Sequence, residues 1–161
     1  MHYTAMKALL VDDDQWFQLG FNAWFRNRFP GISLEVRSEP NVNGDFCIYL
    51  IDNDFHGERL AGQLASQIRQ RSPNALVLAL SATLDAPTLK TLLNQGCHGA
   101  FEKGNHEEFE QLAEILATYL NDYAKVPKSQ SGFLATLRSI TDLLKAWNSR
   151  LDNQESTVAS H

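Results

Sequence analysis

Residues 46–52, Phe-Cys-Ile-Tyr-Leu-Ile-Asp, decide the fold of this 161-residue chain. An uninterrupted apolar run that ends directly in a carboxylate predicts a strand buried on both faces of a parallel sheet. Two similar runs flank it: residues 8–11, which Asp12 and Asp13 follow, and residues 75–80, which Ser81 follows. A shorter run, residues 98–102, ends before Lys103. Because parallel strands end at one edge of their sheet, we expect these polar side chains to gather there.

The rest of the chain to about residue 123 alternates between the two periodicities. We predict strands near 7–12, 32–37, 46–51, 75–80 and 98–102, and helices near 14–28, 58–71, 85–95 and 105–123. Asp14 is a plausible N-cap, Gly96 is expected to end the third of these helices, and Asn105 with Glu108 predicts a capping box. This order predicts an α/β fold with a doubly wound, five-stranded parallel sheet.

One connection is too short for that pattern. Only residues 38–45 separate the second and third predicted strands, and they include Pro40, Asn41 and Gly44. A crossover that holds a full helix needs at least about ten residues. We therefore expect the helix at this place to be short or missing.

The sequence changes character after residue 123. We divide it into a domain over 1–123, a linker over 124–132, an amphipathic, coiled-coil-like helix over 133–151 and a polar, disordered tail over 152–161. The apolar seam of the helix recurs at alternating spacings of four and three: Phe133, Leu137, Ile140, Leu144, Trp147 and Leu151. An isolated helix of this length is marginal in water, so the seam predicts a binding surface. That surface belongs to the same chain, to a second copy in a homodimer or to an effector protein.

Composition excludes several classes of protein. The net charge is −5 and there is no basic run, which argues against a nucleic-acid partner. Cys47 and Cys97 lie in apolar surroundings outside any CxxC pattern, which is typical of free thiols in a reducing compartment. No apolar run is long enough for a signal peptide or a membrane span. We expect a cytoplasmic protein without a membrane partner.

The sequence over about residues 1–123 resembles the response-regulator receiver domains of two-component signalling. The resemblance lies in an acidic pair, a lone aspartate, a serine and a lysine, each at a strand end and in this order. The resemblance implies the flavodoxin-like receiver fold and a phosphoprotein that relays a phosphoryl group in a phosphorelay. Its donor would be a histidine kinase or a phosphotransfer protein, and its output protein–protein contact rather than enzyme activity. The implied site consists of the acceptor Asp52, Mg²⁺ ligands at Asp12, Asp13, Asp52 and the backbone carbonyl of Asp54, and phosphoryl contacts from Ser81 and Lys103.

These residue types suit that chemistry. A carboxylate attacks phosphorus to form an acyl phosphate, and a cation must offset the charge of the transferring group. Mg²⁺ prefers oxygen ligands, including one or two carboxylates. Two residues are candidates for the acceptor. The distance along the sequence from Gly62 favours Asp54. The position along the strand favours Asp52, because choosing Asp54 would bury Asp52 and Asn53 inside a strand. We choose Asp52.

Three features depart from the resemblance, and the first is the short or missing helix over residues 38–45. Ala100 stands three residues before Lys103, where many receivers have Tyr or Phe, and Phe101, one place later, points to the other face of the strand. Gly104 follows Lys103 in place of a common proline. The missing aromatic and the missing helix favour an alternative, a pseudo-receiver adaptor that binds proteins without phosphorylation. A less favoured alternative is a phosphatase, because Asp52-Asn-Asp54 resembles the DxD motif of haloacid-dehalogenase-type phosphatases.

Overall fold

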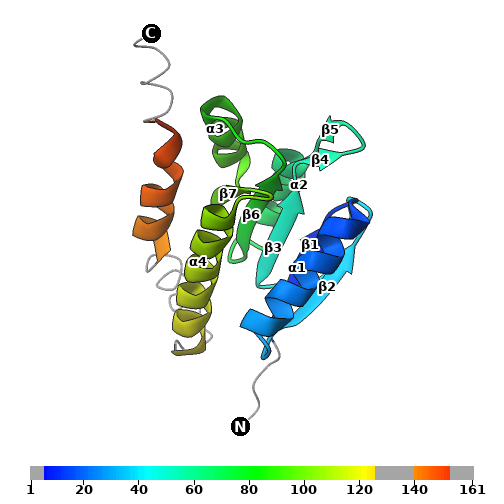
Figure 1. Cartoon of the computed structure of the whole chain (residues 1–161), viewed down its shortest axis with the longest axis vertical. Coiled ribbons are helices and arrows are strands. Elements are labelled where there is room, and N and C mark those ends of the chain that lie inside the picture. The colour runs from blue at the N-terminus through cyan, green and yellow to red at the C-terminus, as the bar shows by residue number, and fades with distance from the viewer. Residues whose placement is uncertain (1–5, 126–139, 153–161) are drawn as a thin grey trace.

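The computed structural model describes residues 6–125 and 140–152 (Figure 1). In chain order the elements are β1 (Lys7–Val11), α1 (Gln15–Arg28), β2 (Ser33–Arg37), β3 (Ile48–Asp52), β4 (Asp54–Phe55), β5 (Glu58–Arg59), α2 (Ala61–Arg71), β6 (Leu76–Ser81), α3 (Ala86–Gln95), β7 (Gly99–Glu102) and α4 (His106–Lys125). Residues 140–152 form a further helix with a turn at residue 149, called helix 140–152 below. The predicted seam residues Phe133 and Leu137, most of the predicted linker and the tail after 152 lie outside the described residues.

The main sheet has five parallel strands in the order β2-β1-β3-β6-β7. The chain runs from β1 outward to β2, returns to β3 on the other side of β1, and then continues outward through β6 to β7. The topological switch point therefore lies between β1 and β3, and the crevice at their carboxyl ends is where open α/β sheets bind ligands. The doubly wound, five-stranded prediction is confirmed, and β7 is an edge strand.

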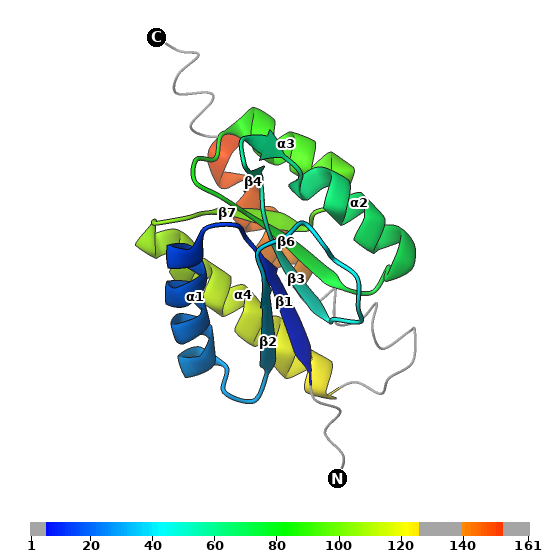
Figure 2. The same cartoon turned by 90° about the vertical axis from the view of Figure 1, so that its right-hand side faces the viewer.

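Alternate residues of the buried strands pack against different helices. In β3, Ile48 and Leu50 belong to a core shared with α1 and α4, whereas Tyr49 and Ile51 belong to a core shared with α2 and α3. Figure 2 shows the two pairs of helices on opposite sides of the sheet. Burial on both faces explains why the strands read as continuous apolar runs rather than as alternating ones.

The helix ends follow the predicted caps with one exception. The Asp14 carboxylate accepts the first free N–H groups of α1, Asn105 does the same for α4, and Gly96 ends α3 with φ +120°. The prediction of a capping box at Glu108 is wrong. Its carboxylate does not turn back to Asn105 but binds the backbone N–H of Glu102 and the guanidinium of Arg150.

Residues 54–59 differ from the prediction, which began a helix at residue 58. They form the two-stranded hairpin β4–β5, and α2 starts only at Ala61. His56 and Gly57 at its tip have φ +48° and +85°, the paired left-handed conformation that a tight two-residue hairpin turn requires.

The short connection between β2 and β3 contains no helix among its residues 38–47, as predicted. Arg37 holds this loop by donating to the carbonyls of Asn41 (3.0 Å) and Asn43 (2.6 Å). The guanidinium satisfies loop carbonyls that a helix would otherwise pair.

Candidate functional site

Three carboxylates meet at the carboxyl ends of β1 and β3. Asp12 and Asp13 follow β1, Asp52 ends β3, and one oxygen of each lies within 4.8 Å of the others. Asp12 is fully buried and Asp52 is only 2% exposed. Acids packed this closely repel one another, and burial removes the water that would screen them, so the cluster calls for a cation.

Lys103 supplies one positive charge to this cluster. Its Nζ lies 2.6 Å from Asp12 Oδ2 and 3.0 Å from Asp52 Oδ1. The residue directly follows β7, and its backbone N–H donates to the Ser81 carbonyl at 2.7 Å, so the sheet itself places the ammonium over the acids. The ammonium also lies 4.4 Å from the centroid of the Phe17 ring. The sequence prediction missed this ring, because its spacing on α1 marks it only as a core aromatic.

The hairpin β4–β5 contacts the acid cluster at Asp13. The backbone N–H of His56 donates to Asp13 Oδ2 at 3.1 Å, and the imidazole Nδ1 lies 3.4 Å from the same oxygen. The imidazole itself is largely exposed. No pattern in the sequence indicated this contact, because it depends on a hairpin that was predicted to be partly helix.

The two acceptor candidates lie in different surroundings. Asp52 is inside the cluster, whereas the side chain of Asp54 is exposed on β4; the backbone N–H of Asp54 donates to Asp52 Oδ1 at 3.1 Å. Asn53 N–H donates to the Leu80 carbonyl at 2.8 Å, which keeps the chain in the sheet at this point. The position that strand counting favoured is therefore the one next to Lys103.

Ser81 ends β6 at the same edge of the sheet and is buried. Its hydroxyl donates to the Thr83 carbonyl at 2.5 Å, within its own loop. A bond from this hydroxyl to a bound phosphoryl group therefore requires rotation of Oγ away from Thr83.

The surroundings change the proton affinities of the cluster. Burial, and after it the negative charge of Asp12, raises the pKa of Asp52 to about 6. Burial also raises the pKa of Asp12. Burial alone would lower the pKa of Lys103, but its bonds to Asp12 and Asp52 outweigh that and raise it. At neutral pH the site therefore holds an ionised Asp52 whose charge is only partly compensated.

This raised pKa gives a testable dependence of stability on pH. An acid whose pKa is 3.8 unfolded and about 6 folded binds protons more tightly in the native state, so its ionisation costs stability as pH rises from 4 to 6. The cost above pH 6 is about 3 kcal/mol. As pH rises from 4 to 7, the unfolding free energy of Asp52→Asn should therefore increase by about this much relative to that of wild type.

Denaturant unfolding of both proteins without metal measures that difference. Burial lowers the pKa of His98 to about 4, so this residue makes the unfolding free energy of the protein fall as pH drops through the same range. That fall masks the effect of Asp52 in wild type alone, and subtracting wild type from the variant removes it. A difference that does not change with pH would contradict the prediction. Millimolar Mg²⁺ should reduce the change, because a cation offsets the same charge.

The seam of helix 140–152 faces the domain that precedes it. Ile140, Leu144 and Leu151 are buried, and the Trp147 ring stacks on Phe101 at a centroid distance of 5.5 Å. As predicted, Ala100 and Phe101 belong to opposite cores of the sheet. Of the three surfaces left open by the sequence, the chain's own domain is the one occupied in this structure, and binding of a second protein stays a prediction.

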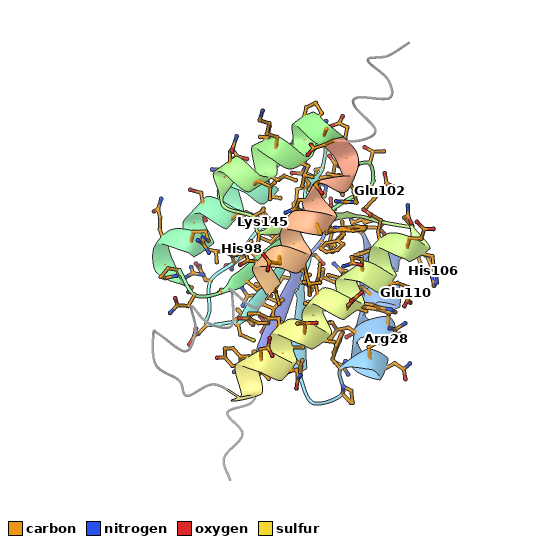
Figure 3. The ribbon with its side chains drawn as sticks, turned by 90° about the vertical axis from the view of Figure 1, so that its left-hand side faces the viewer. Arg28, His98, Glu102, His106, Glu110 and Lys145 are labelled. Atoms are coloured by element: carbon orange, nitrogen blue, oxygen red, sulfur yellow. The ribbon has the colours of Figure 1, made fainter. Side chains whose placement is uncertain are left out.

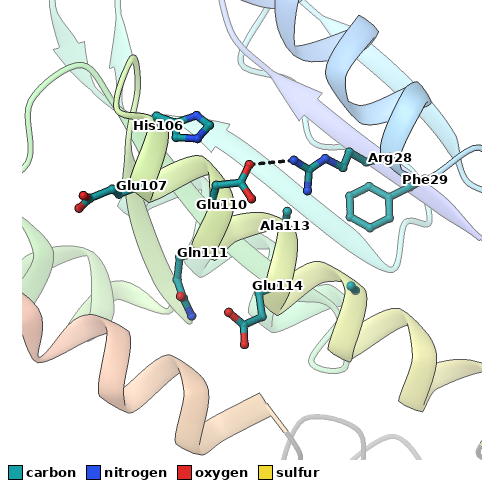
Figure 4. A pocket seen from close by; sticks show the side chains of 9 residues that line it. Arg28, Phe29, His106, Glu107, Glu110, Gln111, Ala113 and Glu114 are labelled. Atoms are coloured by element: carbon teal, nitrogen blue, oxygen red, sulfur yellow. Dashed lines mark hydrogen bonds and ion pairs between the residues drawn. The ribbon is translucent and has the colours of Figure 1, made fainter.

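In the part of the chain that the structure describes, grooves also lie outside the acid cluster, among them two of different size. The larger, about 570 Å³, runs between the end of α1 and α4, beside an exposed ion pair of 2.7 Å between Arg28 and Glu110 (Figure 4). A smaller one, about 230 Å³, lies between Asn53, Arg59 and α3. Exposed ion pairs contribute little to stability, and neither groove contains the three clustered carboxylates.

Comparison with known proteins reveals similar structures but no similar sequence. No protein-family model matches the chain, and no curated protein does. The signal receiver domain of a DNA-binding response regulator from Colwellia psychrerythraea aligns with a TM-score of 0.60 at 19% identity, covering 70% of this chain and 98% of that one. A CheY-like response regulator receiver domain protein from Methanospirillum hungatei gives 0.60 at 17% identity, covering 71% and 93%.

A third similar structure contains a partner. It is the receiver domain of the Saccharomyces cerevisiae response regulator Ssk1, crystallised with the histidine phosphotransfer signaling protein Ypd1, with a TM-score of 0.57 at 16% identity and coverage of 71% and 90%. Together these likenesses establish that the chain has the fold of response-regulator receiver domains. Among the described residues, no helix is long and apolar enough to cross a membrane.

Proposed function

We propose that this chain is a response regulator that accepts a phosphoryl group on Asp52 and signals through protein contacts. The observation that carries the proposal is the position of Lys103 Nζ, 3.0 Å from Asp52 Oδ1 inside a buried cluster of carboxylates. A nucleophile, a cation and metal-type ligands at the switch point of a receiver fold are the parts that phosphoryl transfer needs. The donor is a phosphohistidine on a histidine kinase or a phosphotransfer protein.

The transfer exchanges one bond for another. An oxygen of the Asp52 carboxylate attacks phosphorus, the P–N bond to the donor imidazole breaks, and the imidazole leaves as the neutral base after taking up a proton. Negative charge spreads over the equatorial phosphoryl oxygens in the transition state. Lys103 then pairs with these oxygens instead of with Asp52, and the Ser81 hydroxyl turns from Thr83 to donate to one of them.

The acid cluster fits Mg²⁺, which supplies further positive charge when bound. Oxygens of Asp12, Asp13 and Asp52 lie within 4.8 Å of one another, and Lys103 offsets only one of the three charges. Hard oxygen ligands with room for waters suit Mg²⁺. Asp13 and Asp52 would ligate it directly, Asp12 through water, and the Asp54 carbonyl would add a further oxygen.

Intact mass spectrometry after incubation with phosphoramidate and Mg²⁺ tests the proposal. We expect one added phosphoryl group per chain, lost on chelation of the metal. Absence of an adduct, under conditions that label a control receiver, would favour the adaptor alternative, which is supported by Ala100 and by the missing helix between β2 and β3. Steady hydrolysis of p-nitrophenyl phosphate would instead favour the phosphatase alternative.

The surface beside the site suggests where a donor protein docks. Trp16 and Leu19, on adjacent turns of α1, are 83% and 64% exposed and are the exposed large apolar residues of the described surface. Asp14, which caps their helix, directly follows the acid pair Asp12 and Asp13. A protein covering Trp16 and Leu19 would therefore bring its phosphohistidine close to Asp52. We propose a phosphotransfer domain as the occupant, by analogy with the yeast complex.

Trp16→Ala separates docking from chemistry. We expect transfer from a phosphorylated histidine phosphotransfer protein to slow by about tenfold or more, because tryptophans that become buried in an interface carry much of its binding energy. Labelling by phosphoramidate should stay at the wild-type rate. Gln15→Ala, an exposed polar neighbour, is the matched control. An unchanged rate with the protein donor would show that α1 is not the docking surface.

A further inference from the structure

Helix 140–152 covers the free edge of the main sheet. Among the strands of the described residues, β7 pairs with β6 alone, so its other side presents backbone groups that need partners. Trp147 Nε1 and Arg150 Nη2 each donate to the Ala100 carbonyl at 3.1 Å, and Asn148 Nδ2 donates to the His98 carbonyl at 3.1 Å. Figure 3 shows this helix in orange between α3 and α4, over the strand that His98 and Glu102 delimit.

The apolar contacts of the helix lie on both sides of that edge. Ile140 and Leu144 join the core shared with α1 and α4, whereas Leu151 joins the core shared with α2 and α3. Gly99 in β7 permits this close approach, because a Cβ there would lie 3.1 Å from Leu144 Cδ2 and 3.3 Å from Asn148 Oδ1. The strand and the helix are therefore shaped to fit each other.

One ion pair links this helix to the candidate phosphoryl site. Arg150 binds the buried Glu108 through two bonds, Nε to Oε2 (3.0 Å) and Nη2 to Oε1 (2.8 Å). Glu108 Oε1 also accepts the backbone N–H of Glu102 at 2.9 Å, and Glu102 directly precedes Lys103. A single carboxylate thus holds the helix and the strand end that carries the ammonium.

Glu102 is also tied to the second phosphoryl-binding loop. Its carboxylate accepts the backbone N–H of Leu84 at 3.3 Å, in the loop that begins at Ser81. Phosphorylation of Asp52 would move Lys103 and the Ser81 hydroxyl toward the new oxygens. Glu102 precedes Lys103 and binds the loop that begins at Ser81, so both segments attached to it would shift together. Bidentate charge pairs depend strongly on geometry, which makes the Glu108–Arg150 contact sensitive to that shift.

We propose that helix 140–152 is an intramolecular strap, latched on β7 by Glu108 and Arg150 in the unphosphorylated protein and released when Asp52 is phosphorylated. Release exposes the β7 edge and the Phe101 ring. This inference rests on the proposed function, because it requires a phosphoryl group at Asp52.

Hydrogen exchange of the full chain, read by mass spectrometry, tests the strap. With phosphoramidate and Mg²⁺, we expect peptides within 140–152 and 98–102 to exchange about tenfold faster or more than with Mg²⁺ alone, since loss of a charged hydrogen-bond pair is worth at least that factor. Intact mass of the same samples reports the adduct. An adduct with unchanged or slower exchange overturns the strap and leaves the acceptor proposal standing, whereas no adduct overturns both.

Glu108→Gln tests the latch without a phosphodonor. Glutamine keeps an acceptor for the Glu102 N–H but removes the charge that holds Arg150. We expect exchange in 140–152 to rise about tenfold in this variant while phosphoryl uptake is unchanged. Glu107→Gln removes the same charge from the exposed neighbouring position of α4 and should leave exchange as in wild type. Equal exchange in the two variants would show that the ion pair is not the latch.

Discussion

Asp52→Asn is expected to take up no phosphoryl group from phosphoramidate and Mg²⁺, whereas Asp54→Asn is expected to be labelled once, as the wild type is. Asparagine keeps the size of the side chain but lacks the anionic oxygen that attacks phosphorus. Asp52 lies in the carboxylate cluster 3.0 Å from Lys103 Nζ, while the Asp54 side chain is exposed on the hairpin. The measurement is intact mass followed by peptide mapping of the acyl phosphate.

The matched pair of variants makes the result decisive, because both remove one negative charge from the same six-residue segment, 52–57. Label that survives in Asp52→Asn and is lost in Asp54→Asn would move the acceptor to Asp54 and contradict the assignment. Loss of label in both would point to a role for the Asp54 side chain beyond its backbone carbonyl. Thermal unfolding of each variant confirms that the unlabelled protein is folded.

Lys103→Met is expected to lower the free energy of unfolding at pH 7, without metal, by about 3–5 kcal/mol, the usual cost of removing one partner of a buried ion pair. The ammonium is the group that lies between Asp12 and Asp52, both buried, and methionine retains most of its volume but no charge. Lys90→Met, on the exposed side of α3, is the control and should change stability by less than about 0.5 kcal/mol.

The pH and metal dependence of this loss identify its cause. Near pH 5, Asp52 is largely protonated, because its pKa is raised to about 6, so less repulsion is left uncompensated and the loss should shrink. Millimolar Mg²⁺ should shrink it at pH 7 by restoring positive charge to the cluster. A loss that is the same at both pH values and with metal would mean that Lys103 stabilises the protein through packing on Phe17 instead.

The sequence determines the sheet and the polar groups at its edge. Apolar runs that are buried on both faces identify the parallel strands, and the residues that end them, Asp12, Asp52 and Lys103, converge because parallel strands share an edge. The caps at Asp14, Asn105 and Gly96 and the missing helix after β2 were also predictable, since they depend on neighbours in the chain.

Hairpin β4–β5 was not predictable in the same way. Its strands are two residues each, too short for a periodicity, and residues 58–60 continue the helical spacing of α2 without a break. Consecutive positive φ values at His56 and Gly57 form the turn of the hairpin, and the hairpin places His56 against Asp13. Contacts that depend on such a turn follow from the backbone path rather than from residue spacing.

What the sequence by itself determined is therefore an α/β domain with three acids and a lysine at one edge, and an apolar seam that needs a surface. Only the tertiary structure decided which surface that is. Glu108 has the spacing of a capping residue, yet its carboxylate binds Arg150, 42 residues away, because β7 is an edge strand whose free backbone groups need partners. A local pattern encodes where strands and helices begin and end, whereas the pairing of a strand edge with a distant helix is fixed only when the whole chain is folded.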